Sequence, residues 1–312
     1  MKIGCFLLCI FGIISSWQRV SAQNYWKTPP LWDYGNALKR KFIITTPGYM
    51  GPNALPVPEV KKGLVGNNFY LKAGGEVHFG NGDLTRNTTA ALYYPIVPGK
   101  VAVELYGIPY EAYTLTEGIK QKRRILDQNN AGHVWGDYYV GTILQVVKDK
   151  VYLPDVALAF TLKTASGNHL LNARFTDAPA YFFDLSLGKE FRFKRSALIQ
   201  SARLYGSGGL YVWQTNSDYH PQDDAELYGL GYEIQLKNWN LNQSFAGYHG
   251  YLNFRDKPQV LRTQITFQQR LFSYTLEYQA GLHDFDFQTF KAGLTVFPFR
   301  KKLQALPVLV KQ

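Results

Sequence analysis

Apolar and polar side chains alternate along three consecutive runs near the end of the chain, within residues 260–296. Side chains of a β-strand point alternately to two faces, so each run has one apolar, aromatic face and one polar or charged face. In the middle run, for example, Tyr274 and Leu276 alternate with Thr275 and Glu277. This pattern is typical of a membrane β-barrel with lipid outside and water inside, although a soluble β-sandwich shows the same alternation.

The alternation extends through most of residues 67–298 and predicts about twelve strands, an even number of the kind that bacterial barrels use. The connections also alternate in length. Those at 97–100 and 148–150 are short, whereas those at 111–131 and 165–177 are long. Short turns on one side of a membrane and long loops on the other explain this rhythm. The predicted fold class is all-β: an antiparallel transmembrane β-barrel of about twelve strands.

Residues 1–22 predict a secretory signal peptide. Lys2 precedes an apolar run at 3–14, and Val20-Ser21-Ala22 offers a cleavage site. Both cysteines, Cys5 and Cys9, lie in this segment, so we expect the mature chain to have no disulfide and no thiolate. Together with the barrel pattern, the signal predicts export to the outer membrane.

Two segments flank the predicted barrel. Residues 23–66 are irregular and rich in Pro and Gly, with Trp26 and Trp32 among them. Pro at this density argues against a central strand. We expect this N-terminal segment to pack at the periplasmic mouth or in the lumen, as a possible plug. Residues 299–312 form a short basic tail.

The formal charge is +11, and removal of Lys2 and Arg19 with the signal (11 − 2) leaves +9. Such a balance suits contact with anionic lipid head groups, or it reflects a solvated surface. A basic cluster in the longest predicted outer loop would either meet lipopolysaccharide phosphates or simply be solvated. The cluster consists of Lys120, Lys122, Arg123 and Arg124. The expected partners are outer-membrane lipid and lipopolysaccharide, with no nucleic acid, and the oligomeric state stays open.

Charged side chains of both signs fall on the predicted lumen face of the strands. They are Lys72, Glu76, Glu104, Asp137, Asp155, Lys163, Asp184, Arg203, Glu233, Arg262, Glu277 and Lys291. One interpretation is a network in which acids and bases neutralise each other and make the wall rigid. The other is a selective path or pocket for a polar solute. The mixture of signs, without a ring of one sign, favours the network.

Catalytic groupings are not evident. None of the six histidines has a Ser or a carboxylate at a spacing typical of hydrolases, and no Gly-x-Ser-x-Gly motif occurs. No His, Asp or Glu set has the spacing of metal ligands. We therefore expect no enzyme, no metal and no cofactor.

The signal peptide, the Pro-rich segment and the strand rhythm together resemble outer-membrane β-barrels of Gram-negative bacteria. The run 290–297 resembles the C-terminal signal that the barrel-assembly machinery reads, which implies that machinery as a partner, although residues 298–312 follow it here. Residues 154–158 and 182–189 resemble barrels linked to exopolysaccharide export. The leading functional hypothesis is binding or transport of a small polar or amphipathic solute. The alternatives are a non-catalytic barrel that docks an envelope or exopolysaccharide-export partner and, third, a lipid-modifying enzyme.

Overall fold

A computed structural model describes residues 42–148, 150–193, 198–217 and 219–299. The chain divides into two units, residues 1–40 and 41–312, and all described residues belong to the second. The predicted signal peptide, the first part of the N-terminal segment (23–41) and nearly all of the basic tail lie outside the described residues.

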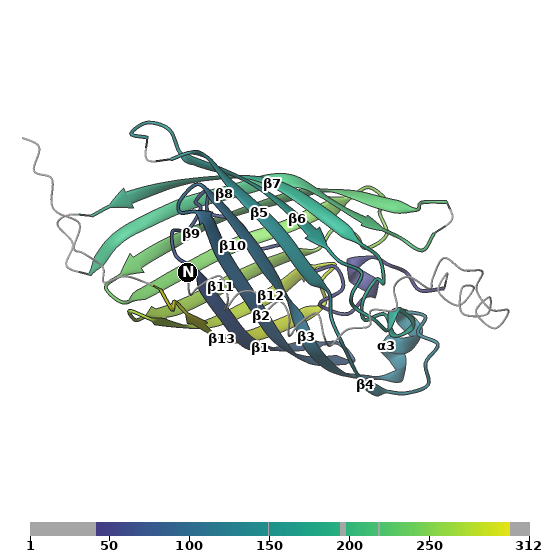
Figure 1. Cartoon of the computed structure of the whole chain (residues 1–312). Coiled ribbons are helices and arrows are strands. Elements are labelled where there is room, and N and C mark those ends of the chain that lie inside the picture. The colour runs from purple at the N-terminus through teal and green to yellow at the C-terminus, as the bar shows by residue number, and fades with distance from the viewer. Residues whose placement is uncertain (1–41, 149, 194–197, 218, 300–312) are drawn as a thin grey trace, which may run out of the picture. The chain divides into compact units, whose positions relative to one another are not determined.

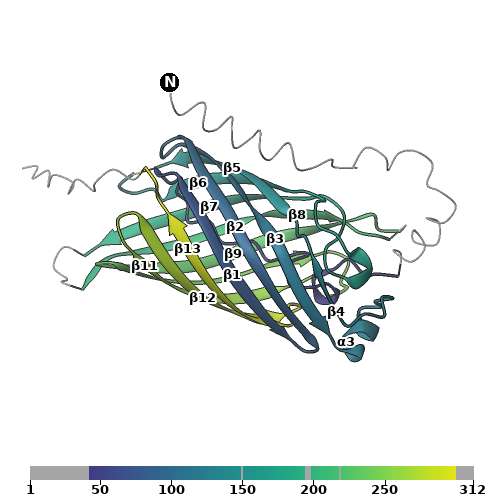
Figure 2. The same cartoon turned by 60° about the horizontal axis from the view of Figure 1, so that its bottom comes forward.

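Strands make up most of the described chain, and twelve of them close into an antiparallel barrel (Figures 1 and 2). Each strand pairs with the next, and β1 pairs with β13 to close the ring. The strands are β1 (Tyr70–Gly80), β2 (Asp83–Val97), β3 (Val101–Leu115), β4 (Ala131–Val134), β5 (Tyr138–Val147), β6 (Asp155–Lys163), β7 (Ala180–Arg192), β8 (Ile199–Gln214), β9 (Gln222–Leu236), β10 (Trp239–Gly250), β11 (Gln259–Gln268), β12 (Phe272–His283) and β13 (Phe287–Val296). The thirteenth, β4, is short and pairs only with the end of β3.

The two faces of the strands are as the sequence pattern predicted. On β12, Leu276 exposes 66% of its surface on the outside, whereas Glu277 exposes 8% on the inside. On β7, Phe183 and Leu185 point outward and Asp184 is buried between them. The predicted fold class and strand number are therefore confirmed.

Two boundaries differ from the prediction. Residues 132–147, between two predicted connections, form two strands instead of one: the chain is interrupted at 135–137, because Asp137 turns inward to bind Lys163 and the backbone N–H of Gly167. The loop expected from residue 111 begins later, since β3 continues to Leu115. The same loop contains a short helix, α3 (Glu117–Lys122).

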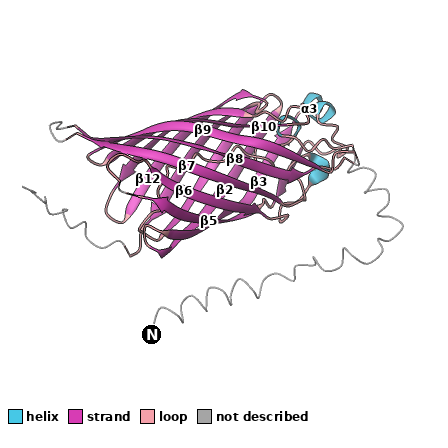
Figure 3. Ribbon diagram, turned by 90° about the horizontal axis from the view of Figure 1, so that it is seen from above, coloured by secondary structure: helices cyan, strands magenta, loops and turns pink. Residues whose placement is uncertain are grey.

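The connections between strands make the two ends of the barrel different. One end, here called the loop end, carries the connections at 81–82, 116–130, 164–179, 215–221, 251–258 and 284–286. The other, the turn end, carries those at 98–100, 148–154, 193–198, 237–238 and 269–271. Viewed from above, α3 lies at the loop end (Figure 3). Within the described residues, no helix is long and apolar enough to span a membrane.

Residues 42–66, here called the inner segment, lie in the lumen. At the loop end, the Thr46 hydroxyl donates to the Phe254 carbonyl (2.9 Å), next to the 3₁₀ turn η2 (Pro47–Tyr49). At the turn end, the Gly66 N–H donates to the Tyr93 hydroxyl (2.7 Å). The inner segment therefore runs from the loop end to the turn end before the chain reverses into β1. Its role as a plug stays a prediction.

Side chains of the wall satisfy the backbone of the inner segment, which has no strand partner. Trp213 Nε1 donates to the Thr45 carbonyl, and the Tyr248 hydroxyl donates to that of Leu55 (2.8 Å). Leu55 also packs in a buried cluster with Trp213, Tyr211 and Tyr248. Buried backbone groups need such partners, and aromatic residues supply both a bond and apolar area.

Candidate functional site

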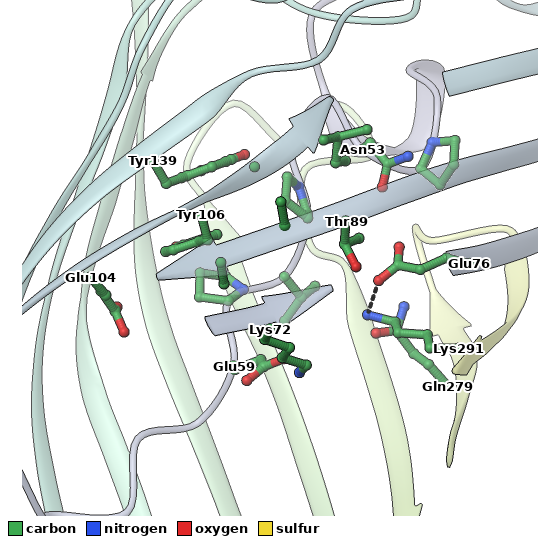
Figure 4. A pocket seen from close by; sticks show the side chains of 18 of the residues that line it. Asn53, Glu59, Lys72, Glu76, Thr89, Glu104, Tyr106, Tyr139, Gln279 and Lys291 are labelled. Carbon is green, nitrogen blue, oxygen red and sulfur yellow. Dashed lines mark ion pairs between the residues drawn. The ribbon is translucent and has the colours of Figure 1, made fainter. Parts of the chain in front are cut away.

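The inner segment and the wall enclose a cavity of about 240 Å³ in the lumen (Figure 4). Its walls come from residues 52–61 of the inner segment and from strands on both sides of the barrel closure, including β1, β2, β3, β11, β12 and β13. Concave, mixed apolar and polar spaces of this kind are where proteins bind small molecules. The cavity is therefore the candidate site.

Glu76 and Lys291 form the ionic side of the cavity. Lys291 Nζ lies 3.3 Å from Glu76 Oε1 and 3.4 Å from Glu277 Oε1. His78 joins this group, with Nε2 3.3 Å from the second oxygen of Glu76 and Nδ1 2.8 Å from the Thr289 hydroxyl. One lysine between two carboxylates is a neutralising arrangement that orders the wall.

Arg262 contacts the inner segment directly. Its Nη2 and Nη1 donate to the carbonyls of Val57 (2.5 Å) and Pro58 (3.1 Å), and its Nε donates to Gln279 Oε1 (2.7 Å). Within the described residues, Arg262 forms no ion pair with a carboxylate. Its positive charge is therefore not neutralised by the wall.

Aromatic rings make up the apolar side. Tyr106 and Tyr139 stack with their centroids 4.8 Å apart and their planes 2° apart, and Tyr70 stacks on Tyr93 in the same way at 4.9 Å. Phe182 adds a further ring to the lining. Flat aromatic surfaces favour solutes with an apolar or ring-shaped body.

Four charged side chains remain on the cavity wall: Lys61, Glu104, Glu59 and Lys72. Lys61 Nζ binds Glu104 Oε1 at 2.5 Å. Glu59 of the inner segment is exposed to the cavity and interacts electrostatically with Lys72 (Figure 4). Neither Glu59 nor Lys72 forms a direct ion pair with any described residue. They are thus available to a bound solute.

A second charged group, here called the mouth network, lies at the loop end. Arg174, from the connection between β6 and β7, is fully buried and binds Asp83 (2.8 Å) and Glu111 (2.7 Å). Arg123 also binds Asp83 (2.5 Å), and Glu111 accepts a hydrogen bond from Asn53 of the inner segment (2.6 Å). These contacts join two loops, two strands and the inner segment.

All twelve charged residues expected in the lumen lie on the inner face of the barrel, but only some of them come together. Five line the central cavity: Lys72, Glu76, Glu104, Arg262 and Lys291. Glu277 lies beside them through its ion pair with Lys291. The others are elsewhere in the lumen: the buried pair Asp137–Lys163, the pair Asp155–Arg203, Glu233 bound to Lys62, and buried Asp184. As a binding site, the set stays a prediction.

The surface-loop basic cluster needs correction. Lys122 and Arg124 are exposed, but Lys120 exposes only 5% of its surface and Arg123 only 3%. Lys120 Nζ donates to the carbonyl of Gln128 because α3 folds this loop back on itself. Only two of the four cations face solvent, so they do not form one patch.

Sequence reasoning missed Glu59 and the residues of the mouth network. Glu59 stands in a Pro-rich stretch without periodicity, so nothing in the sequence assigns it a face. Arg174 belongs to a loop, and strand alternation does not reveal a loop that folds back over the lumen. The missed signal was an isolated Arg among apolar and small residues in the stretch Leu170–Phe175.

Three solved structures are similar to this chain. An outer membrane channel from Pseudomonas putida F1 is 10% identical, with a TM-score of 0.51, and the match covers 78% of this chain and 97% of that one. KdgM porin is 8% identical (TM-score 0.42; 72% and 98% covered), and the translocator domain of the autotransporter NalP from Neisseria meningitidis is 9% identical (TM-score 0.44; 74% and 89% covered). No protein-family model and no curated protein matches the sequence. The chain has the fold of the outer-membrane β-barrel proteins.

Proposed function

We propose that this protein is an outer-membrane barrel that binds a small polar or amphipathic solute in its central cavity and passes it through the lumen. The observation that carries the proposal is the cavity itself, because it combines stacked tyrosines with charged groups at mid-lumen. The barrel fold, shared with an outer membrane channel, supports it. Bacterial outer-membrane barrels have short periplasmic turns and longer outer loops, so we place the loop end outside the cell and the turn end in the periplasm.

Passage of a solute requires the inner segment to move. In the arrangement described above, this segment extends along the lumen, so the cavity is a pocket on its surface. Beside the apolar packing of Leu55, its polar contacts to the wall are individual hydrogen bonds and ion pairs, such as those of Arg262 and Lys62. Such contacts contribute about 1 kcal/mol each, with more for charged groups, so a competing ligand is able to offset several of them.

Filling the cavity tests the proposal. Ala91 of β2 lines the cavity, whereas Ala73 of β1 is exposed on the opposite face of the sheet. We expect Ala91→Trp to reduce solute flux into proteoliposomes, measured by swelling rates, and Ala73→Trp to leave it at the wild-type rate. Equal flux through both variants and the wild type would place the path outside the cavity and reject the proposal.

A second candidate, docking of an envelope partner, has its own supporting observation at the turn end. Val151 and Tyr152 expose 79% and 95% of their surface in the connection between β5 and β6. Lys189 Nζ donates to the carbonyls of Lys150, Val151 and Leu153, which fixes this turn. Replacement of both apolar residues by Ser should abolish co-purification of a partner while solute flux is unchanged.

A further inference from the structure

We infer that the cavity is a carboxylate-binding site and that Glu59 of the inner segment occupies it in place of a solute carboxylate. The inference rests on the proposed function and adds the chemical class of the solute. The solute is a small carboxylate with an apolar or ring-shaped body. Glu59 acts as a ligand supplied by the protein itself.

The surroundings of Glu59 are cationic. Lys72 of β1, Arg262 of β11, Lys291 of β13 and Lys61 of the inner segment line the same cavity as Glu59 and attract its carboxylate (Figure 4). Three of these four cations belong to the barrel wall. The wall therefore presents positive charge to a single carboxylate that the inner segment supplies.

Charge balance in the cavity depends on Glu59. Lys291 is already paired with Glu76, and Lys61 with Glu104. Lys72 and Arg262 form no direct ion pair with a described residue, so the Glu59 carboxylate in the same cavity is the charge that offsets them. If Glu59 moves away with the inner segment, two cations of the wall lose their counter-charge, and the cost is greater for Arg262, which exposes only 5% of its surface. An anion that enters as Glu59 leaves removes this cost.

The exchange gives a carboxylate solute an advantage over neutral or cationic solutes. A ligand shifts a conformational equilibrium only by its difference in affinity for the two states. A solute carboxylate binds to the cations in the state in which Glu59 has left them. In the state in which Glu59 is in place, the solute must compete with it. A cationic solute would be repelled by Lys72 and Arg262 once Glu59 had left.

The apolar side of the cavity defines the body of the solute. The stacked pair Tyr106–Tyr139 and the ring of Phe285 line the same space as Lys72 and Arg262. Rings of this kind bury apolar or planar groups well. A carboxylate on a ring-shaped body therefore matches both sides of the cavity, and benzoate is the simplest probe.

The full-chain variant Glu59→Gln tests the inference by removing the competing charge. Benzoate binding to the detergent-solubilised protein, measured by equilibrium dialysis, should become about tenfold tighter or more, as expected for the loss of one charge competitor. Benzylamine, which has the same ring and the opposite charge, should bind to Glu59→Gln no more tightly than to the wild type. The double variant Glu59→Gln/Lys72→Gln should lose the gain for benzoate. Glu226→Gln, a matched loss of an exposed carboxylate on β9, should bind as the wild type does.

Two results would overturn the inference: no tighter benzoate binding by Glu59→Gln, or an equal gain for benzylamine. A difference in gel migration between heated and unheated samples of each variant verifies that its barrel is folded. The flux assay with Ala91→Trp distinguishes failure of the carboxylate inference from failure of transport through the cavity. If Ala91→Trp blocks flux while Glu59→Gln gains no benzoate affinity, transport through the cavity stands and the carboxylate class is rejected.

Discussion

At the scale of single residues, Arg174 shows how much depends on one buried charge. Burial alone would lower the pKa of the Arg174 guanidinium, but Asp83 and Glu111 raise it above its ordinary value. The residue is therefore charged at every physiological pH. Removal of the cation leaves Glu111 buried without its ion pair and leaves Asp83 with Arg123 as its remaining cation.

We expect Arg174→Ala to destabilise the barrel by roughly 3–5 kcal/mol, the cost of breaking a buried ion pair by removal of one partner. The temperature at which the unheated gel band converts to the unfolded form measures this loss. Arg192→Ala is the matched control, because its side chain is 69% exposed and its ion pair with Glu190 lies at the surface. If both variants lose the same stability, the mouth network is not a structural anchor.

The lipid-facing residues give a second prediction at this scale. Leu276→Arg places a cation on the outer face, where Leu276 is 66% exposed, and should cost about 2–4 kcal/mol if the position is near the bilayer midplane. Gln235→Arg, on the half-buried inner face of β9, should cost much less. Unfolding in urea from lipid vesicles measures both. Similar losses for the two variants would mean that the outer face of β12 does not contact lipid.

The inner faces are less uniform than alternation suggests. The sequence places Gln279 among lumen residues that contact water, yet it exposes only 4% of its surface and accepts a hydrogen bond from Arg262. A lumen residue beside the inner segment is thus packed as tightly as a core residue. Strand periodicity assigns the face of a residue but does not show what occupies the space in front of it.

At the scale of elements, the strands were predictable and the connections were not. Each strand has a period of two that a single substitution hardly disturbs, so twelve strands follow from the sequence. The loop end depends on contacts between residues far apart in the chain, such as the hydrogen bond from Gly51 to the Ala173 carbonyl. The path of the inner segment likewise depends on wall side chains, so its Pro-rich sequence predicted a place in the lumen or at its mouth but not the route through it.

Asp286 connects three elements of the loop end and gives a pH prediction. Burial raises the pKa of this carboxyl, but hydrogen bonds from Lys122 and Arg255 outweigh burial and hold it below its ordinary value. A carboxyl whose pKa is lowered by folding stabilises the folded state at pH values above its unfolded pKa. This stabilisation is lost as the pH falls through the pKa of the folded state. The loop end should therefore loosen only in strong acid.

The effect should be small, roughly 0–1 kcal/mol, because Asp286 is 39% exposed and exposed ion pairs contribute little. Asp286→Asn should reproduce it at neutral pH as faster trypsin cleavage after Lys122 and Arg255. Asp224→Asn, at an exposed carboxylate of β9, should leave the cleavage rate unchanged. Cleavage at the wild-type rate in Asp286→Asn would show that these loops do not depend on the ion pairs.

At the scale of the whole molecule, the question is whether the inner segment is a fixed part of the wall or a movable plug. Val60 of this segment packs against Gly229 of β9, whose Cβ position would lie 2.5 Å from Val60 Cγ2. Two cysteines at these positions would have Cβ atoms close to the roughly 3.5–4.5 Å that a disulfide needs. The two natural cysteines lie in the predicted signal peptide, so the engineered pair should form without competition.

We expect Val60→Cys/Gly229→Cys to conduct poorly in planar bilayers when oxidised, because the disulfide holds the inner segment in the lumen. Reduction should raise the conductance to the wild-type level or above, since the Val60 contact is then lost. Each single cysteine variant should be insensitive to reductant. A movable plug requires that the oxidised state be closed and the reduced state open. If the oxidised double variant conducts as well as the reduced one, the inner segment is a permanent lining, and solutes pass beside it.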